Sequence, residues 1–268
     1  MIRVDALLLL MLQFNVLSST KIISSFRTGV FGDTSVTHSK SLTSSGIIST
    51  VAGSHGFSEF PTVTSYFVTK GVATDVAENL FITTDGHGDG NRIFTATAST
   101  GLITVVAGTG KEGFSGDGGP AAAATFDGLS GIAVDKLGNI YVADTRNNRI
   151  RKITVSTGVI TTVAGTGKNS SYTTVDNVVA TSSTLSYPAD VAVDAYGNIY
   201  IAGSYRVRKV TASTGIITTI AGNDDGLGYG ARAFPKLGAA AGVSGFGWLT
   251  GITVDTFGNV FFSDRSFK

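Results

Sequence analysis

The sequence contains no cysteine, which excludes disulfide bonds and thiolate metal sites. It has only three histidines, His38, His55 and His87, and they occupy unrelated positions in the chain. They indicate neither a histidine metal site nor a Ser-His-Asp triad, so we expect no metal and no cofactor. Charged residues make up 15% of the chain and the net charge is +1, so the overall field does not single out nucleic acid or an anionic membrane.

The sequence also lacks a hydrophobic run long enough to span a bilayer. Its longest one, residues 6–17, is interrupted by Gln13 and Asn15. Together with Arg3 and the serines that follow, this run predicts a signal peptide over residues 1–20, although Asp5 and the lack of an Ala-x-Ala site count against it. A mis-started reading frame or a degenerate first strand is the alternative. The sequon at Asn169 agrees with an extracellular or cell-surface location, and the other possibility is the cytoplasm.

What the chain does have is 35 glycines and an internal repeat. Residues 131–144 have the sequence GIAVDKLGNIYVAD, and similar sequences occur at residues 190–203 and 251–264. The aspartate of this text falls at positions 75, 135, 194 and 255, with steps of 60, 59 and 61 residues. Equal spacing of this kind predicts an array of equivalent structural units.

Each repeat contains four short apolar, β-branched runs separated by Gly, Asn and Asp turns, which predicts four antiparallel strands. Several strands are apolar on both faces, so the sheets are expected to be covered on both sides. Four-stranded sheets in series favour an all-β fold, the β-propeller. Separate hairpins would leave these apolar residues in water, and a β-helix would have a shorter period.

The repeat resembles the NHL family, in text such as GIAVDKLGNIYVAD, NRIRK and TGVITTVAG within residues 131–165. The resemblance implies a propeller over residues 21–268, with blades at 71–108, 131–165 and 190–222 and partial blades at 30–53 and 251–268. Residues 30–34 can be overlaid on a second strand. The partial blades predict either a compact ring of about four blades, completed by both chain ends, or a diverged or truncated part of a larger ring.

The charged and polar residues of the repeat allow several interpretations. The recurring aspartates at 75, 135, 194 and 255 are interpreted as turn caps and not as a carboxylate cluster. Asp144 and Arg149 are expected to form an ion pair within their own loop. Basic residues recur on the third strands, where neighbours such as Arg208 and Lys209 should point in opposite directions. The loop between the second and third strands supplies the predicted binding residues, Asp144, Arg146, Asn147, Asn148, Arg149 and Arg206.

Three functions remain open on the sequence alone. The first is a non-catalytic interaction module that binds a protein or glycan through the loops between blades, which is typical of propellers. The second is an intracellular RNA-binding or scaffold domain that uses the basic third strands, as some NHL domains do. The third is a metal-dependent lyase or hydrolase, as some six-bladed relatives are. No catalytic residue is identified for this third function.

Overall fold

In a computed structural model, the chain forms two compact units, residues 1–62 and 63–268. The structure describes residues 22–26, 38–42, 48–52, 68–86, 90–169, 175–222 and 246–265. The predicted signal peptide, the overlay of residues 30–34 and the last two residues of the Asn169 sequon lie outside these ranges. The expected ring that both chain ends complete concerns both units and stays a prediction.

The first unit contains one antiparallel sheet in the order β1-β2-β3, with β1 at Ile22–Phe26, β2 at His38–Leu42 and β3 at Ile48–Ala52. Its pairing register shifts between Ser39 and Lys40. The third strand of each complete repeat has the same irregularity, so β2 and β3 correspond to the third and fourth strands of a repeat.

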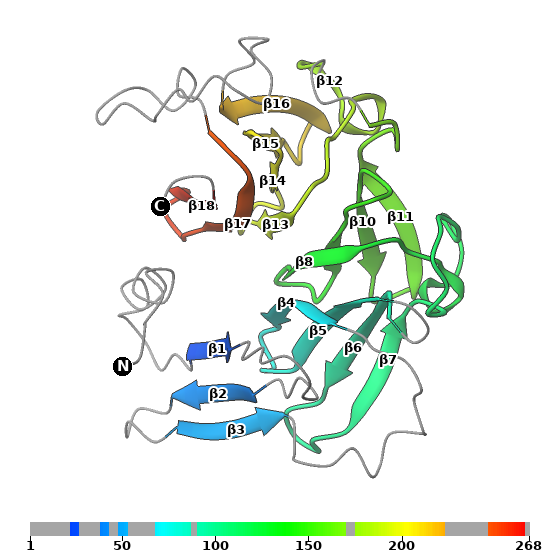
Figure 1. Cartoon of the computed structure of the whole chain (residues 1–268), viewed down its shortest axis with the longest axis vertical. Helices are drawn as coiled ribbons and strands as arrows, with labels where there is room; N and C mark the ends of the chain where they lie inside the picture. Colours follow the sequence, from blue (N-terminus) through cyan, green and yellow to red (C-terminus); the bar gives the residue numbers. More distant parts are fainter. Residues whose placement is uncertain are drawn as a thin grey trace. The chain divides into compact units, whose positions relative to one another are not determined.

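The second unit contains the repeats as antiparallel sheets (Figure 1). Blade A consists of β4 (Val68–Thr74), β5 (Leu80–Asp85), β6 (Arg92–Ala96) and β7 (Ile103–Ala107). Blade B consists of β8 (Leu129–Val134), β9 (Ile140–Asp144), β10 (Arg149–Thr154) and β11 (Val159–Ala164). The prediction of four-stranded propeller blades is therefore confirmed.

Blade C consists of β13 (Asp190–Val193), β14 (Ile199–Gly203), β15 (Arg206–Val210) and β16 (Ile216–Ala221), and β12 (Val178–Val179) adds a fifth strand beside β16. The last sheet, sheet D, pairs β17 (Leu249–Val254) with β18 (Val260–Asp264). The first strands of these sheets, β4, β8, β13 and β17, are neighbours in that order (Figure 1).

The hydrophobic core lies between adjacent sheets. One cluster joins Phe81 and Ile93 of blade A to Ile140 and Ile160 of blade B. A second cluster joins blade B to blade C, and a third joins blade C to sheet D. Both faces of β9 and β14 are buried by this packing, which explains why these strands do not alternate between apolar and polar residues.

The segments between blades contribute to the next blade's outer edge. Before blade B, Gly118 and Ala121 donate backbone hydrogen bonds to Ile160 and Gly158, and a short 3-10 helix, η1, follows at Ala121–Ala123. Before blade C, β12 and the 3-10 helix η2 (Ala180–Ser182) occupy the same place. The described parts of these linkers therefore bring polar side chains onto the third strand of the blade that they precede.

The recurring aspartates cap the turns between the first and second strands, as expected. In blade B, Asp135 Oδ1 accepts hydrogen bonds from the backbone N–H groups of Leu137 and Asn139, both at 2.9 Å. Its Oδ2 accepts one from the Asn139 side chain at 2.8 Å. The same set of bonds surrounds Asp75, Asp194 and Asp255, so these carboxylates shape the fold.

Candidate functional site

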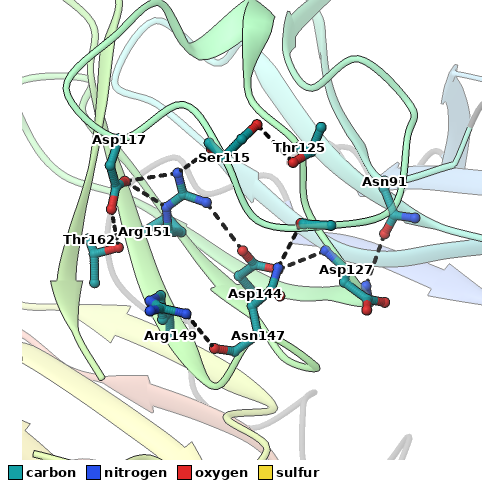
Figure 2. A network of polar contacts seen from close by, with 12 residues as sticks. Asn91, Ser115, Asp117, Thr125, Asp127, Asp144, Asn147, Arg149, Arg151 and Thr162 are labelled. Carbon is teal, nitrogen blue, oxygen red and sulfur yellow. Dashed lines mark hydrogen bonds and ion pairs between the residues drawn. The ribbon is translucent and has the colours of Figure 1, made fainter. Parts of the chain in front are cut away.

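The loop between β9 and β10 is held by the buried carboxylate of Asp144, the last residue of β9 (Figure 2). Its Oδ1 accepts hydrogen bonds from the Asp127 backbone N–H and the Asn147 side chain, both at 2.9 Å. Its Oδ2 accepts one from Arg151 Nη1 at 3.3 Å. Burial raises the pKa of Asp144 to about 6, although these bonds and the Arg151 charge act in the opposite direction.

Arg151, on β10, is fully buried and uses its whole guanidinium group (Figure 2). Besides Asp144, it binds the carboxylate of Asp117 through Nε at 3.0 Å and the Ser115 carbonyl through Nη2 at 3.0 Å. Asp117 also accepts a hydrogen bond from Thr162 at 2.6 Å. The linker before blade B is thereby fixed onto β10 and β11.

The expected ion pair between Asp144 and Arg149 is wrong, because Asp144 pairs with Arg151. Asp144 and Arg149 face each other across the ladder, but Arg149 donates to the carbonyls of Asn147 and Thr166. Its guanidinium also lies over the Phe114 ring at 3.8 Å. The linker folds back over β10, so Asp117, which lies 34 residues before Arg151 in the sequence, accepts a hydrogen bond from it.

Arg146 is the most exposed of the predicted binding residues, with a side chain 53% exposed. It forms ion pairs with Asp127 at 3.1 Å and with Asp85 of blade A at 3.5 Å. The hydrogen bond that Arg146 donates to the Asp127 carboxylate raises the pKa of the Arg146 guanidinium. Arg146 therefore links blade A to blade B and still presents much of its side chain to solvent.

The side chains of Asn147 and Asn148 connect the loop to neighbouring segments by hydrogen bonds. Asn147 donates to the Gly113 carbonyl at 2.8 Å, and the buried Asn148 accepts from the Tyr187 backbone N–H at 3.0 Å. The structure brings five of the predicted residues together in this loop. Arg206 lies apart from them, on β15 of blade C.

Blade C departs from this arrangement. Gly203 stands where blade B has Asp144, and the loop that follows it is two residues shorter. Tyr205 takes the place of Asn148 and keeps a positive φ of 66°. In the described part of the chain, the Ser204 hydroxyl and two N–H groups of Arg208 are buried without a hydrogen-bond partner. The polar network of the repeat is therefore incomplete in this loop.

Three aromatic side chains gather beside this incomplete loop. The Trp248 ring lies 6.2 Å from the Tyr187 ring and 6.1 Å from the Tyr205 ring, measured between centroids. Tyr187 is 37% exposed and Trp248 is 38% exposed, and the backbone N–H of Tyr205 donates to the Gly247 carbonyl. We call Tyr187, Tyr205 and Trp248 the aromatic cluster. Sequence reasoning missed it because its members come from three separate segments, and the only signal was the altered loop of this copy.

The basic residues of the third strands do not form one face. Arg151 and Arg208 are buried, while Lys152 and Lys209 lie over the rings of Tyr141 and Tyr200 at 5.3 and 5.4 Å. The expectation that Arg208 and Lys209 point in opposite directions is confirmed. Arg151 and Arg208 therefore cannot reach a phosphate backbone from their buried positions.

Among the residues that the structure describes, no three His, Asp or Glu side chains are placed to hold a metal ion. The Gly-rich turn after Asp85 includes residues 87–89, which lie outside the described ranges. No helix of the described part is long and apolar enough to cross a membrane.

Comparison with known proteins identifies the repeat. The family model "NHL repeat" matches residues 126–153, which include β8, β9 and most of β10. Teneurin-3 from Danio rerio is 37% identical over 136 residues, which is 45% of this chain and 5% of that protein. The chain therefore contains an NHL repeat at residues 126–153, within sheets of the β-propeller type, in agreement with the resemblance.

Solved structures with this fold differ in what they do. A Bacteroides thetaiotaomicron protein of unknown function has a TM-score of 0.60 at 15% identity, over 91% of this chain and 54% of that chain. A chain of the nidogen/laminin complex has a TM-score of 0.51 at 13% identity, over 85% and 67%. A Xanthomonas campestris gluconolactonase has a TM-score of 0.50 at 13% identity, over 86% and 65%. At these identities the likeness shows the fold alone.

Proposed function

We propose that this chain is a non-catalytic interaction module that binds a protein or glycan at the loop end of blade C and sheet D. The observation that carries the proposal is the aromatic cluster. Tyr and Trp supply large, rigid contact area together with a polar group, and they are enriched where proteins bind their partners. A cluster of partly exposed aromatic rings in the blade that departs from the repeat is best explained by a ligand.

Arg146 and Arg206 extend this proposed binding face, while Asp144, Asn147, Asn148 and Arg149 hold the loops that support it. The fold is compatible with this role, because a similar chain occurs in the nidogen/laminin complex. The same fold also carries a gluconolactonase, so the fold does not exclude catalysis. The RNA alternative is weakened by the burial of Arg151 and Arg208.

We also propose an extracellular or cell-surface location, which rests on the signal-like residues 1–20 and on the exposed Asn169 of the sequon. Mass spectrometry of the protein from its native source tests this. Loss of about the first 20 residues with a glycan on Asn169 is the expected result. An intact Met1 and an unmodified Asn169 would contradict it and favour the cytoplasmic alternative.

The binding proposal can be tested with Trp248, because it is the only tryptophan in the sequence. Candidate ligands come from a glycan array and a displayed peptide library, and each is titrated while Trp248 fluorescence is followed. We expect a fluorescence change on binding. The affinities of the variants are measured by calorimetry, because Trp248→Ala removes the only tryptophan. Trp248→Ala and Tyr187→Ala should weaken binding about 30-fold, a typical loss for a central aromatic contact.

Two aromatic residues provide matched controls. Tyr196 and Phe257, 85% and 90% exposed, lie in the turns at the opposite end of the strands. Tyr196→Ala and Phe257→Ala should leave the affinity unchanged. A ligand that binds the cluster variants as tightly as it binds the wild type would overturn the proposed site. Binding of RNA with a steep salt dependence would favour the alternative function.

A further inference from the structure

The guanidinium group of Arg208 is buried and only partly satisfied. Its side chain is 4% exposed, and Nη2 donates to Asp176 at 2.7 Å, to the Val175 carbonyl at 3.1 Å and to Ser183 at 3.2 Å. Nε and Nη1 are buried and have no hydrogen-bond partner among the described residues. Such donors are rare inside proteins, and each one calls for an explanation.

Blade B shows which partner is missing. Arg151 precedes Arg208 by 57 residues, and its Nη1 donates to Asp144 at 3.3 Å. The residue in the place of Asp144 is Gly203, which removes the carboxylate. Gly203 is not among the residues with positive φ, so its backbone conformation is one that aspartate also adopts. The φ of Gly203 therefore does not require glycine, although a Cβ atom there would need a small shift of the Ser186 carbonyl. One effect of the glycine is to leave Nη1 without an acceptor.

The carboxylate partners of the two arginines differ in the same way. In blade B, Arg151 has two, Asp117 and Asp144. In blade C, Arg208 has one among the described residues, Asp176. Arginine does not lose its proton in proteins, so Nη1 stays a charged donor that needs an acceptor. A buried donor of a charged group without an acceptor is unfavourable, and an anion from solution would supply the acceptor that Asp144 supplies in blade B.

We propose that Nη1 of Arg208 binds a small monovalent anion, a halide ion or a carboxylate of formate size, in the place that the Asp144 carboxylate occupies in blade B. The space is narrow, because a Cβ atom at Gly203 would already lie 3.0 Å from the Ser186 carbonyl oxygen. Large anions such as gluconate are therefore excluded. The site does not depend on the ligand proposed for the aromatic cluster.

Thermal unfolding at constant ionic strength tests the proposal, with sodium chloride replaced step by step by sodium gluconate. An ion that binds only the folded state raises Tm as its concentration rises. For a protein of this size we expect roughly 3–6 °C for each tenfold increase above the Kd. Equal Tm values in chloride and gluconate would overturn the proposal and would indicate that water satisfies Nη1.

Two reciprocal variants separate this site from general salt effects. Gly203→Asp supplies the carboxylate that blade B has, so its Tm should no longer respond to chloride. Asp144→Gly removes the carboxylate from blade B, so it should create a second chloride response. A chloride response of unchanged size in Gly203→Asp would place the anion elsewhere and contradict the proposal.

Bromide gives a direct measurement that does not depend on the stability of the variants. Anomalous scattering from bromide-soaked crystals of the wild-type protein should show one ion within hydrogen-bonding distance of Arg208 Nη1. Crystals of Gly203→Asp should show none there. Wild-type crystals without bromide at Arg208, or bromide only at exposed lysines as an adventitious ion, would overturn the assignment.

Discussion

Asp190 Oδ2 accepts a hydrogen bond from the backbone N–H of Ile252 at 2.8 Å and thereby joins β13 of blade C to β17 of sheet D. The first strands of the other sheets have glycine at this position, Gly71, Gly131 and Gly251. A Cβ atom at Gly131 would overlap the Asp190 carboxylate, so this carboxylate fills the space that the neighbouring glycine leaves. Burial raises the pKa of Asp190 to about 7.

The raised pKa predicts that stability falls as the pH increases between about 4 and 7. An aspartate in the unfolded chain has a pKa of about 3.9, so the folded state binds more protons in this range. The contribution of Asp190 is complete below about pH 4 and is lost as the pH rises through 7. Asp190→Asn keeps an acceptor for Ile252 but does not ionise. Its free energy of unfolding is measured by urea titrations from pH 4.5 to 8. Over this range it should decline less than that of the wild type, with a difference on the order of 2 kcal/mol.

Asp144 is the matched control, because burial also raises its pKa, to about 6. It still titrates in the Asp190→Asn variant, so part of the pH dependence should remain. Parallel stability curves for the wild type and the variant across this pH range would show that Asp190 is ionised at low pH and would contradict the prediction.

The two arginines of β10 should differ strongly in their effect on stability. Arg151→Ala leaves the buried Asp144 without its cation, and removal of one partner of a buried ion pair costs about 3–5 kcal/mol. Arg149→Ala removes hydrogen bonds to two carbonyls and the contact with Phe114, which should cost about 1–2 kcal/mol. Urea unfolding of both variants provides the comparison. An equal or larger loss for Arg149→Ala would contradict the assignment of the ion pair to Arg151.

The different roles of Arg149 and Arg151 also show how much of the structure can be predicted from the sequence. The four-stranded blades and the turn caps can be predicted from local sequence patterns that recur, such as the aspartate and asparagine of each turn. Arg149 and Arg151 are two residues apart and point to the same side of one strand. The alternation of side chains along a strand therefore does not predict different roles for them. Their roles depend on Asp117 and Phe114 in a linker more than 30 residues away, whose path local patterns do not reveal.

The aromatic cluster could not be predicted for a related reason. Tyr187 precedes β13, Tyr205 lies between β14 and β15, and Trp248 precedes β17 of the next sheet, so only packing between sheets brings them together. The sequence did show that the copy containing Gly203 has a shorter loop. A departure of one repeat from its neighbours was therefore the one available indication of a distinct site.

The turn of blade A should be less stable than its counterparts, because Glu78 adopts a φ of 64° where the other copies have glycine. A residue with a Cβ atom pays about 1 kcal/mol in this conformation. Glu78→Gly should therefore raise the free energy of unfolding by up to about 1 kcal/mol. Gly138→Ala, at the same place in blade B, should lower it by a similar amount, because added atoms there meet no neighbour and only the backbone is strained. A gain in stability from Gly138→Ala in urea unfolding would refute this account.

Asn148 should connect the stability of blade B to binding at the aromatic cluster. It adopts a φ of 51°, and its side-chain oxygen accepts the Tyr187 backbone N–H at 3.0 Å. Asn148→Gly keeps the backbone conformation but removes the acceptor, whereas Asn148→Asp retains an acceptor at the same place. We expect the glycine variant to lose about 1–2 kcal/mol of stability, because a partly buried N–H group loses its partner.

The same pair of variants tests whether Asn148 positions Tyr187. The loss of its hydrogen bond should loosen the segment that carries this ring, so Asn148→Gly should weaken ligand binding and alter the fluorescence of Trp248. Asn148→Asp should preserve both. Asn91 provides the control, since its side chain accepts the Gly128 N–H at 2.9 Å at the equivalent place between blades A and B. Asn91→Gly should destabilise the protein to a similar extent and leave the Trp248 signal unchanged, since Gly128 lies outside the aromatic cluster.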